Sequence, residues 1–101
     1  MESDQQSVIS DIESYVARVD RAYSRWYIGI ASDPRQRLFN DHAVDEKSGA
    51  WILRGCASSA AARDVENHFV RRGMKGGPGG GDPSTKSVYA YKITMTTIER
   101  N

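Results

Sequence analysis

The spacing of apolar residues predicts helices at two places in the chain. Residues 5–22 carry one apolar stripe in which side chains recur every three or four positions, as on one face of a helix. This stripe consists of Val8, Ile9, Ile12, Tyr15, Val16 and Val19. Residues 59–72 combine an alanine-rich run with a second stripe, and Gly73 is expected to end that helix.

Three other segments have the length and the alternation that are typical of strands. They are residues 26–31 (WYIGIA), 50–56 (AWILRGC) and 86–94 (KSVYAYKIT). Asp33 followed by Pro34 is typical of a helix start, which places a further helix after the first strand. The predicted order is therefore α-β-α-β-α-β. We expect an α/β (α+β) domain with a small, mainly antiparallel three-stranded sheet flanked by helices.

The remaining segments are predicted to be loops. Residues 74–85 are rich in glycine and could cover a site or form a floppy excursion. They do not form a phosphate-binding P-loop, because the Lys-Ser/Thr pair is missing and no helix follows. The tail from Met95 is polar and is expected to fray.

Composition and charge narrow the class of protein. The 101 residues predict one domain over residues 1–101. The net charge is +1, but the first 20 residues carry five acidic groups against Arg18 alone, so the rest carries +5. Most of the 14 basic residues are arginine, which slightly favours a polyanionic partner. Cys56 is the single cysteine, and no apolar run approaches the ~20 residues of a membrane span. We therefore expect a cytoplasmic protein without membrane contact.

One strand–turn–helix segment contains side chains suited to chemistry on a phosphate. The first strand brings Tyr27 to a junction, and the following helix presents Arg37 and Asp41 on one face. His42 would lie ~100° further round that helix. Gly29 interrupts the strand, which often marks a bulge or the close approach of another group. An aromatic hydroxyl, a guanidinium and an imidazole near one point suit phosphate chemistry.

The run YIGIASDPRQR, residues 27–37, resembles the YIG strand, turn and arginine-bearing helix of the GIY-YIG nuclease superfamily. In particular, Arg37 lies eight residues beyond Gly29. The segment 50–56 followed by SSAAARDVENHF is similar to the next strand and the glutamate-bearing helix of that family. The resemblance covers roughly residues 26–72, about half of the chain.

The chain departs from the family pattern in three respects. A helix stands where the family has its GIY strand, whereas Tyr91-Lys92-Ile93 near the C-terminus resembles the Tyr-Lys-Ile of that strand. We hypothesise a circular permutation that moves the first strand to the C-terminus and puts Tyr91 in the place of the first tyrosine. The family histidine usually lies four residues after the arginine, where this chain has Asp41 and then His42. The late asparagine of the family has no clear counterpart.

The resemblance implies a metal-dependent endonuclease that hydrolyses phosphodiester bonds of nucleic acid, DNA in preference to RNA. One Mg²⁺ or Mn²⁺ ion would be held weakly by a single carboxylate and would keep several waters. A homodimer or a protein partner would supply specificity. The implied site consists of the metal ligand Glu66, the catalytic residues Tyr27, Arg37, His42 and Tyr91, and the substrate-contacting residues Gly29 and Arg35.

Other interpretations stay open at this point. The domain could bind nucleic acid without cleaving it, as the departures from the family pattern would allow. It could also be a protein–protein interaction domain that uses exposed Trp26, Trp51 and Tyr23. The interpretation without a site makes Tyr27 a half-buried strand residue, Arg37 a surface salt-bridge residue, and His42 and Glu66 solvated helix residues.

Overall fold

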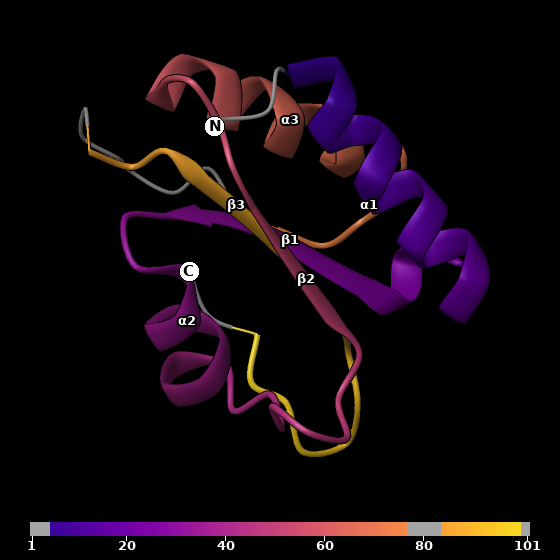
Figure 1. Cartoon of the computed structure of the whole chain (residues 1–101). Helices are drawn as coiled ribbons and strands as arrows, with labels where there is room; N and C mark the ends of the chain where they lie inside the picture. Colours follow the sequence, from indigo (N-terminus) through magenta and orange to yellow (C-terminus); the bar gives the residue numbers. More distant parts are fainter. Residues whose placement is uncertain (1–4, 77–83, 100–101) are drawn as a thin grey trace.

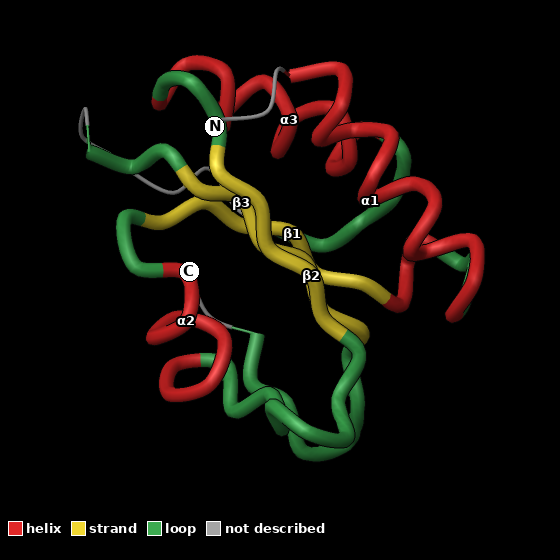
Figure 2. Tube along the Cα trace, in the orientation of Figure 1, coloured by secondary structure: helices red, strands yellow, loops and turns green. Residues whose placement is uncertain are grey.

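The computed structural model of the protein describes residues 5–76 and 84–99. Two helices cover one face of a sheet and a short helix lies on the other face (Figure 1), and the trace in Figure 2 shows the same layers coloured by structure type. The predicted α+β class with a three-stranded sheet is confirmed. The elements in chain order are α1 (Gln5–Val19), η1 (Tyr23–Arg25), β1 (Trp26–Ala31), α2 (Pro34–Gln36), η2 (Arg37–Asp41), β2 (Trp51–Gly55), α3 (Ser59–Arg71) and β3 (Ser87–Lys92).

The central strand of the sheet is β3, and both β1 and β2 run antiparallel to it. In the pairing of β1 with β3, Tyr27 lies opposite Tyr91 and Gly29 lies opposite Tyr89. The C-terminal strand therefore lies beside the strand that contains Tyr27. The other two strands are parallel to each other and are joined only through β3.

Side chains alternate between the two faces of the sheet, and both faces are covered. On one face Trp26 and Ile28 of β1 pack with Phe69 of α3 in the larger apolar cluster. On the other face Tyr27 packs with Leu38 of η2 in a smaller, aromatic-rich cluster. Because both faces of β1 are buried, a polar group that this strand carries must find a partner inside the protein.

The third helix, α3, presents its apolar stripe to the sheet as predicted. Ser58 caps it by accepting a hydrogen bond from the Ala61 N–H at 3.0 Å. Val65 and Phe69 are fully buried, and Glu66 lies beside them with only 3% of its surface exposed. In the part of the chain that the structure describes, no helix has both the length and the apolar character that a membrane crossing requires.

The first helix ends at Val19, three residues before the predicted end, because Asp20 takes other partners. The Asp20 carboxylate accepts a hydrogen bond from the Ala22 N–H at 3.0 Å and pairs with Arg25 at 3.1 Å and Lys92 at 3.2 Å. The hydrogen bonds from Ala22 and Arg25 lower the pKa of this carboxyl to about 2. Asp20 thus connects the end of α1 to the end of the central strand.

Part of the predicted glycine-rich loop over residues 74–85 instead extends the sheet. The Lys75 N–H donates to the Trp26 carbonyl at 2.8 Å, and the Lys75 carbonyl accepts from the Ile28 N–H at 2.9 Å. This parallel bridge covers the outer edge of β1. The centre of the predicted loop, residues 77–83, lies outside the described residues.

We expect Lys75→Pro to lower the free energy of unfolding by ~1–3 kcal/mol, because proline cannot donate to the Trp26 carbonyl. Lys75→Ala keeps the N–H and is the matched control, with an expected change within ~0.5 kcal/mol. Urea denaturation of both variants measures the difference. Equal stability of the two variants would show that the bridge contributes nothing.

Candidate active site

Three tyrosine side chains meet on the face of the sheet that α2 and η2 cover. The rings of Tyr27 and Tyr91 stack with their centroids 5.3 Å apart. The ring of Tyr89 lies 6.5 Å from that of Tyr27. Tyr89 and Tyr91 share this face because they are two residues apart in one strand. All three are at most 5% exposed, so the cluster is an interior one.

The π-helical turn η2 places His42 against these tyrosines. The His42 N–H donates to the carbonyl of Arg37, five residues back, at 2.8 Å. A regular α-helix would make this hydrogen bond from Asp41, four residues after Arg37. The predicted pairing of Arg37 with Asp41 on one face is confirmed by their ion pair. The α-helical period assumed in placing His42 does not hold here, because the turn from Arg37 to Asp41 is π-helical.

The imidazole of His42 is fully buried, and each of its ring nitrogens has a partner. Nδ1 lies 2.6 Å from the Ile98 carbonyl oxygen, and Nε2 lies 2.8 Å from the Tyr89 hydroxyl. A carbonyl can only accept, so Nδ1 carries the proton and Nε2 accepts from Tyr89. Burial lowers the pKa of His42 below 6.5, although the hydrogen bond to Ile98 opposes this shift. The lowered pKa keeps the ring neutral at pH 7.

The C-terminal tail closes over this cluster. The Ile98 N–H donates to the His42 carbonyl at 2.8 Å. The Ile98 carbonyl also accepts from the Tyr91 hydroxyl at 3.2 Å. The expectation that the tail frays from Met95 is therefore wrong as far as Ile98. The reason is that the buried polar groups of His42 and Tyr91 need partners, and the backbone of Ile98 supplies them.

Arg37 lies where the cluster reaches solvent. Its side chain is 29% exposed, and its Nη1 pairs with an Asp41 carboxylate oxygen at 2.8 Å. Its charge opposes the rise in the pKa of Tyr27, and its charge and hydrogen bond do the same for Tyr89. A phosphate group arriving from solvent would therefore meet the Arg37 guanidinium before the buried hydroxyls.

Glu66 is a carboxylate whose charge acts on Tyr27 and Tyr89. Only 3% of its surface is exposed. Burial raises its pKa from 4.5 to about 7, and the charge of Arg63 opposes this rise. Its charge in turn raises the pKa of Tyr27 and Tyr89. A nearly buried carboxylate with a raised pKa is a candidate ligand for a cation.

No cluster of three or more metal-binding side chains occurs within the described ranges. If Glu66 held a divalent ion, water and substrate oxygens would therefore supply most of the other ligands. This donor set suits Mg²⁺ or Mn²⁺, which keep several waters, better than a metal that needs a closed cage.

The tyrosine hydroxyls are held in their neutral form by the surrounding chain. Burial raises the pKa of Tyr27 above 10, and burial raises that of Tyr89 to about 12. The pKa of Tyr91 rises for the same reason, with a further contribution from the neighbouring tyrosines. Tyr27 as a base requires the opposite direction, so the side chains alone do not activate it.

Tyr89 is the site residue that the sequence analysis missed. A Cβ added at Gly29 would lie 2.5 Å from Cζ of Tyr89. The close approach that the glycine indicated is therefore made by this ring, which covers the Gly29 backbone. Two signals could have identified it: Tyr89 alternates with Tyr91 on the same face, and antiparallel pairing of the two strands puts it opposite Gly29.

Arg35, which was expected to contact substrate, lies beside β2. Its guanidinium is 5.1 Å from the centroid of the Phe39 ring and 5.9 Å from that of Trp51. It also pairs with the carboxylate of Glu46. These contacts connect Arg35 to Trp51, and they do not bring it together with the tyrosine cluster.

One of the three aromatic residues proposed for a protein-interaction surface is buried and cannot take part in such a surface. Trp26 is fully buried, and its Nε1 donates to the Asp20 carbonyl at 2.8 Å. Tyr23 packs edge-to-face on Phe69 with centroids 5.9 Å apart and is only partly exposed. The expectation of an exposed Trp26 is therefore wrong, because β1 is covered on both faces.

We expect Gly29→Ala to destabilise the protein by ~1–3 kcal/mol, because the new methyl group would overlap the Tyr89 ring. The same substitution in a Tyr89→Ala background should cost less, since the overlapping ring is gone. A double-mutant cycle from urea denaturation measures this coupling. Additive effects within ~0.5 kcal/mol would show that the Tyr89 ring is not the cause.

Glu66→Gln should remove a pH dependence of stability. With the pKa of Glu66 raised from 4.5 to about 7, the folded protein binds more protons between these values than the unfolded chain does. Its contribution to stability is therefore complete below pH 4.5 and is lost as the pH rises through 7. We expect the stability of Glu66→Gln relative to the parent to rise by up to about 3 kcal/mol between pH 4.5 and 8.

Urea denaturation across that pH range measures this difference. Asp64→Asn is the matched control, because Asp64 is an exposed carboxylate on the same helix. A pH-independent difference between Glu66→Gln and the parent would contradict the raised pKa.

Comparison with known proteins gives no match to a family model, to a curated protein or to a solved structure. The interpretation of this site therefore depends on the geometry of its own side chains.

Proposed function

We propose that the protein is a metal-dependent endonuclease that hydrolyses phosphodiester bonds of nucleic acid, DNA in preference to RNA, with a permuted GIY-YIG-like arrangement. The observation that carries the proposal is the pairing of Tyr27 with Tyr91 across β1 and β3, with His42 packed on both rings. Residues far apart in sequence thus meet at one point. Arg37 and Glu66 both act electrostatically on Tyr27 at that point.

Each side chain has a role that follows from its surroundings. Arg37, the solvent-facing cation, binds a non-bridging phosphate oxygen and exchanges part of its contact with Asp41 for it. Glu66 would hold the divalent ion, and its pKa of about 7 means that the ion would compete with a proton for this carboxylate. The ion would supply positive charge to the phosphate and lower the pKa of its bound water.

Tyr27 lies between these two charges. Neutralising Glu66 removes one of the groups that raise the pKa of Tyr27, and the charge of Arg37 then acts without that opposition. The Tyr27 hydroxyl is thereby placed to orient the attacking water or to accept its proton. The neutral His42 and Tyr91 hold the Tyr27 ring from two sides, with ring centroids 4.7 Å and 5.3 Å away.

Purified protein is expected to nick supercoiled plasmid DNA in the presence of Mg²⁺ or Mn²⁺ and to stop when EDTA is added. Glu66→Gln and Arg37→Gln should each reduce the rate by ~100-fold or more, because Arg37 supplies positive charge to the transition state and Glu66 would hold the ion that does the same. Arg71→Gln is the matched control for the loss of a positive charge, since Arg71 is exposed at the end of α3. Gel analysis of the plasmid forms gives the rates.

Nicking that persists at the parental rate in Glu66→Gln would contradict the proposed role of this carboxylate. A second candidate, a domain that binds nucleic acid without cleaving it, is favoured by the burial of Tyr27 and by its raised pKa. Salt-sensitive retention of DNA without any metal-dependent nicking would favour that function instead.

A further inference from the structure

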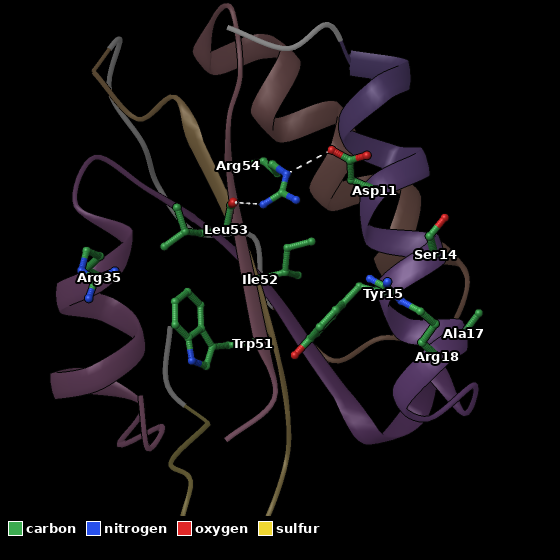
Figure 3. A pocket seen from close by; sticks show the side chains of 10 residues that line it. All are labelled: Asp11, Ser14, Tyr15, Ala17, Arg18, Arg35, Trp51, Ile52, Leu53 and Arg54. Atoms are coloured by element: carbon green, nitrogen blue, oxygen red, sulfur yellow. Dashed lines mark hydrogen bonds and ion pairs between the residues drawn. The ribbon is translucent and has the colours of Figure 1, made fainter. Parts of the chain in front are cut away.

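A groove of about 770 Å³ runs along the outer edge of β2. Figure 3 shows its floor at Leu53 and Arg54 of β2, with Tyr15 and Arg18 of α1 on one side and Trp51 on the other. Because β3 occupies the inner side of β2, this edge has no strand partner among the described residues. The groove is therefore open to an extended ligand.

The backbone at the floor of the groove disfavours a peptide strand as that ligand. β2 bonds to β3 at both ends, through the Ala50 carbonyl and the Cys56 N–H. By the alternation of an antiparallel pair, the backbone groups of Trp51 and Leu53 point outward. However, the Leu53 carbonyl already accepts from Arg54 Nη1 at 2.8 Å. An incoming peptide N–H would meet a guanidinium where it needs an acceptor.

The same arrangement favours an anionic ligand. Three arginines and one aspartate line the groove, which gives a net charge of +2. Arg54 uses only part of its donor set, through Nη1 to Leu53 and Nε to Asp11 at 3.0 Å. Arg18 has no ion pair within the described chain, and its guanidinium lies 6.0 Å from the centroid of the Tyr15 ring. Both cations thus have donors available to phosphate.

Trp51 gives the groove a firmly held aromatic wall. Its indole packs edge-to-face on Phe39 with centroids 5.0 Å apart, and its Nε1 donates to the Glu46 carbonyl at 3.0 Å. The guanidinium of Arg35 lies over the same ring system. Basic grooves with aromatic side chains bind single strands, because bases stack on the rings while phosphates follow the cations.

We propose that this groove binds a single-stranded segment of nucleic acid, with phosphates on Arg18 and Arg54 and a base stacked on Trp51. The proposal rests on the proposed nuclease function for its choice of ligand. Trp51 lies opposite Tyr91 in the sheet, so a strand in the groove continues toward the candidate active site. A duplex does not fit this role, because its base faces are stacked on one another and do not reach the indole.

The test is a fluorescence titration with an oligothymidylate of about 12 nucleotides in EDTA, so that no cleavage occurs. The chain has two tryptophans, and Trp26 is fully buried, so quenching reports on Trp51. The parent protein should be quenched, and Trp51→Phe should lose most of the quenching while keeping its fold by circular dichroism. Arg18→Gln should weaken binding ~5-fold or more, and Arg71→Gln less than ~2-fold.

Three outcomes would overturn the proposal. Equal affinities of Arg18→Gln and Arg71→Gln for oligothymidylate would show that the groove is not the binding site. Equal affinity for a duplex of the same length would remove the preference for a single strand. Equal quenching by a glutamate oligomer would make an acidic peptide the ligand. If any of these occurs while plasmid nicking persists, the groove proposal fails and the nuclease proposal stands. If the protein binds oligothymidylate as expected but does not nick plasmid DNA, the groove proposal stands and the nuclease proposal fails.

Discussion

The buried imidazole of His42 is the constraint on which the rest of the site depends. Its two nitrogens and its backbone carbonyl hold three segments that are distant in sequence: η2, the central strand and the tail. A buried neutral histidine is stable only if both nitrogens are satisfied. The tautomer follows from the Ile98 carbonyl, so a backbone group at one end of the chain determines which nitrogen faces Tyr89. The arrangement of the tyrosines is therefore tied to the docking of the tail.

The fold was largely predictable because its signals are local. The stripes of the two long helices, the Asp33-Pro34 start and the alternation around Tyr91 all appear within short windows of sequence. The placement of His42 was not predictable in this way. It depends on a π-helical turn, and a pattern read at α-helical period cannot indicate where one extra residue is accommodated. Tyr89 was missed because its role comes from strand register, which is a tertiary property.

Burial favours the neutral forms of Glu66 and Tyr27, whereas the charge of Arg37 favours an ionised Tyr27. Glu66 and Tyr27 both prefer their neutral forms in this interior, and Arg37 is the cation that moderates this preference for Tyr27. Burial of such ionisable groups gives up stability that apolar side chains would have provided. The burial of Glu66 together with its raised pKa is the kind of local inconsistency that accompanies function more often than packing.

The position of β3 as both the last strand in sequence and the central strand in space has a consequence for biosynthesis. Until residues 87–92 have left the ribosome, β1 and β2 have no common partner, and two strand edges with apolar faces stay exposed on the nascent chain. α1 and α3 can form beforehand, but the sheet against which they pack cannot. The sheet is therefore assembled through long-range contacts that form only after β3 is available, which slows folding and keeps the strand edges exposed for longer.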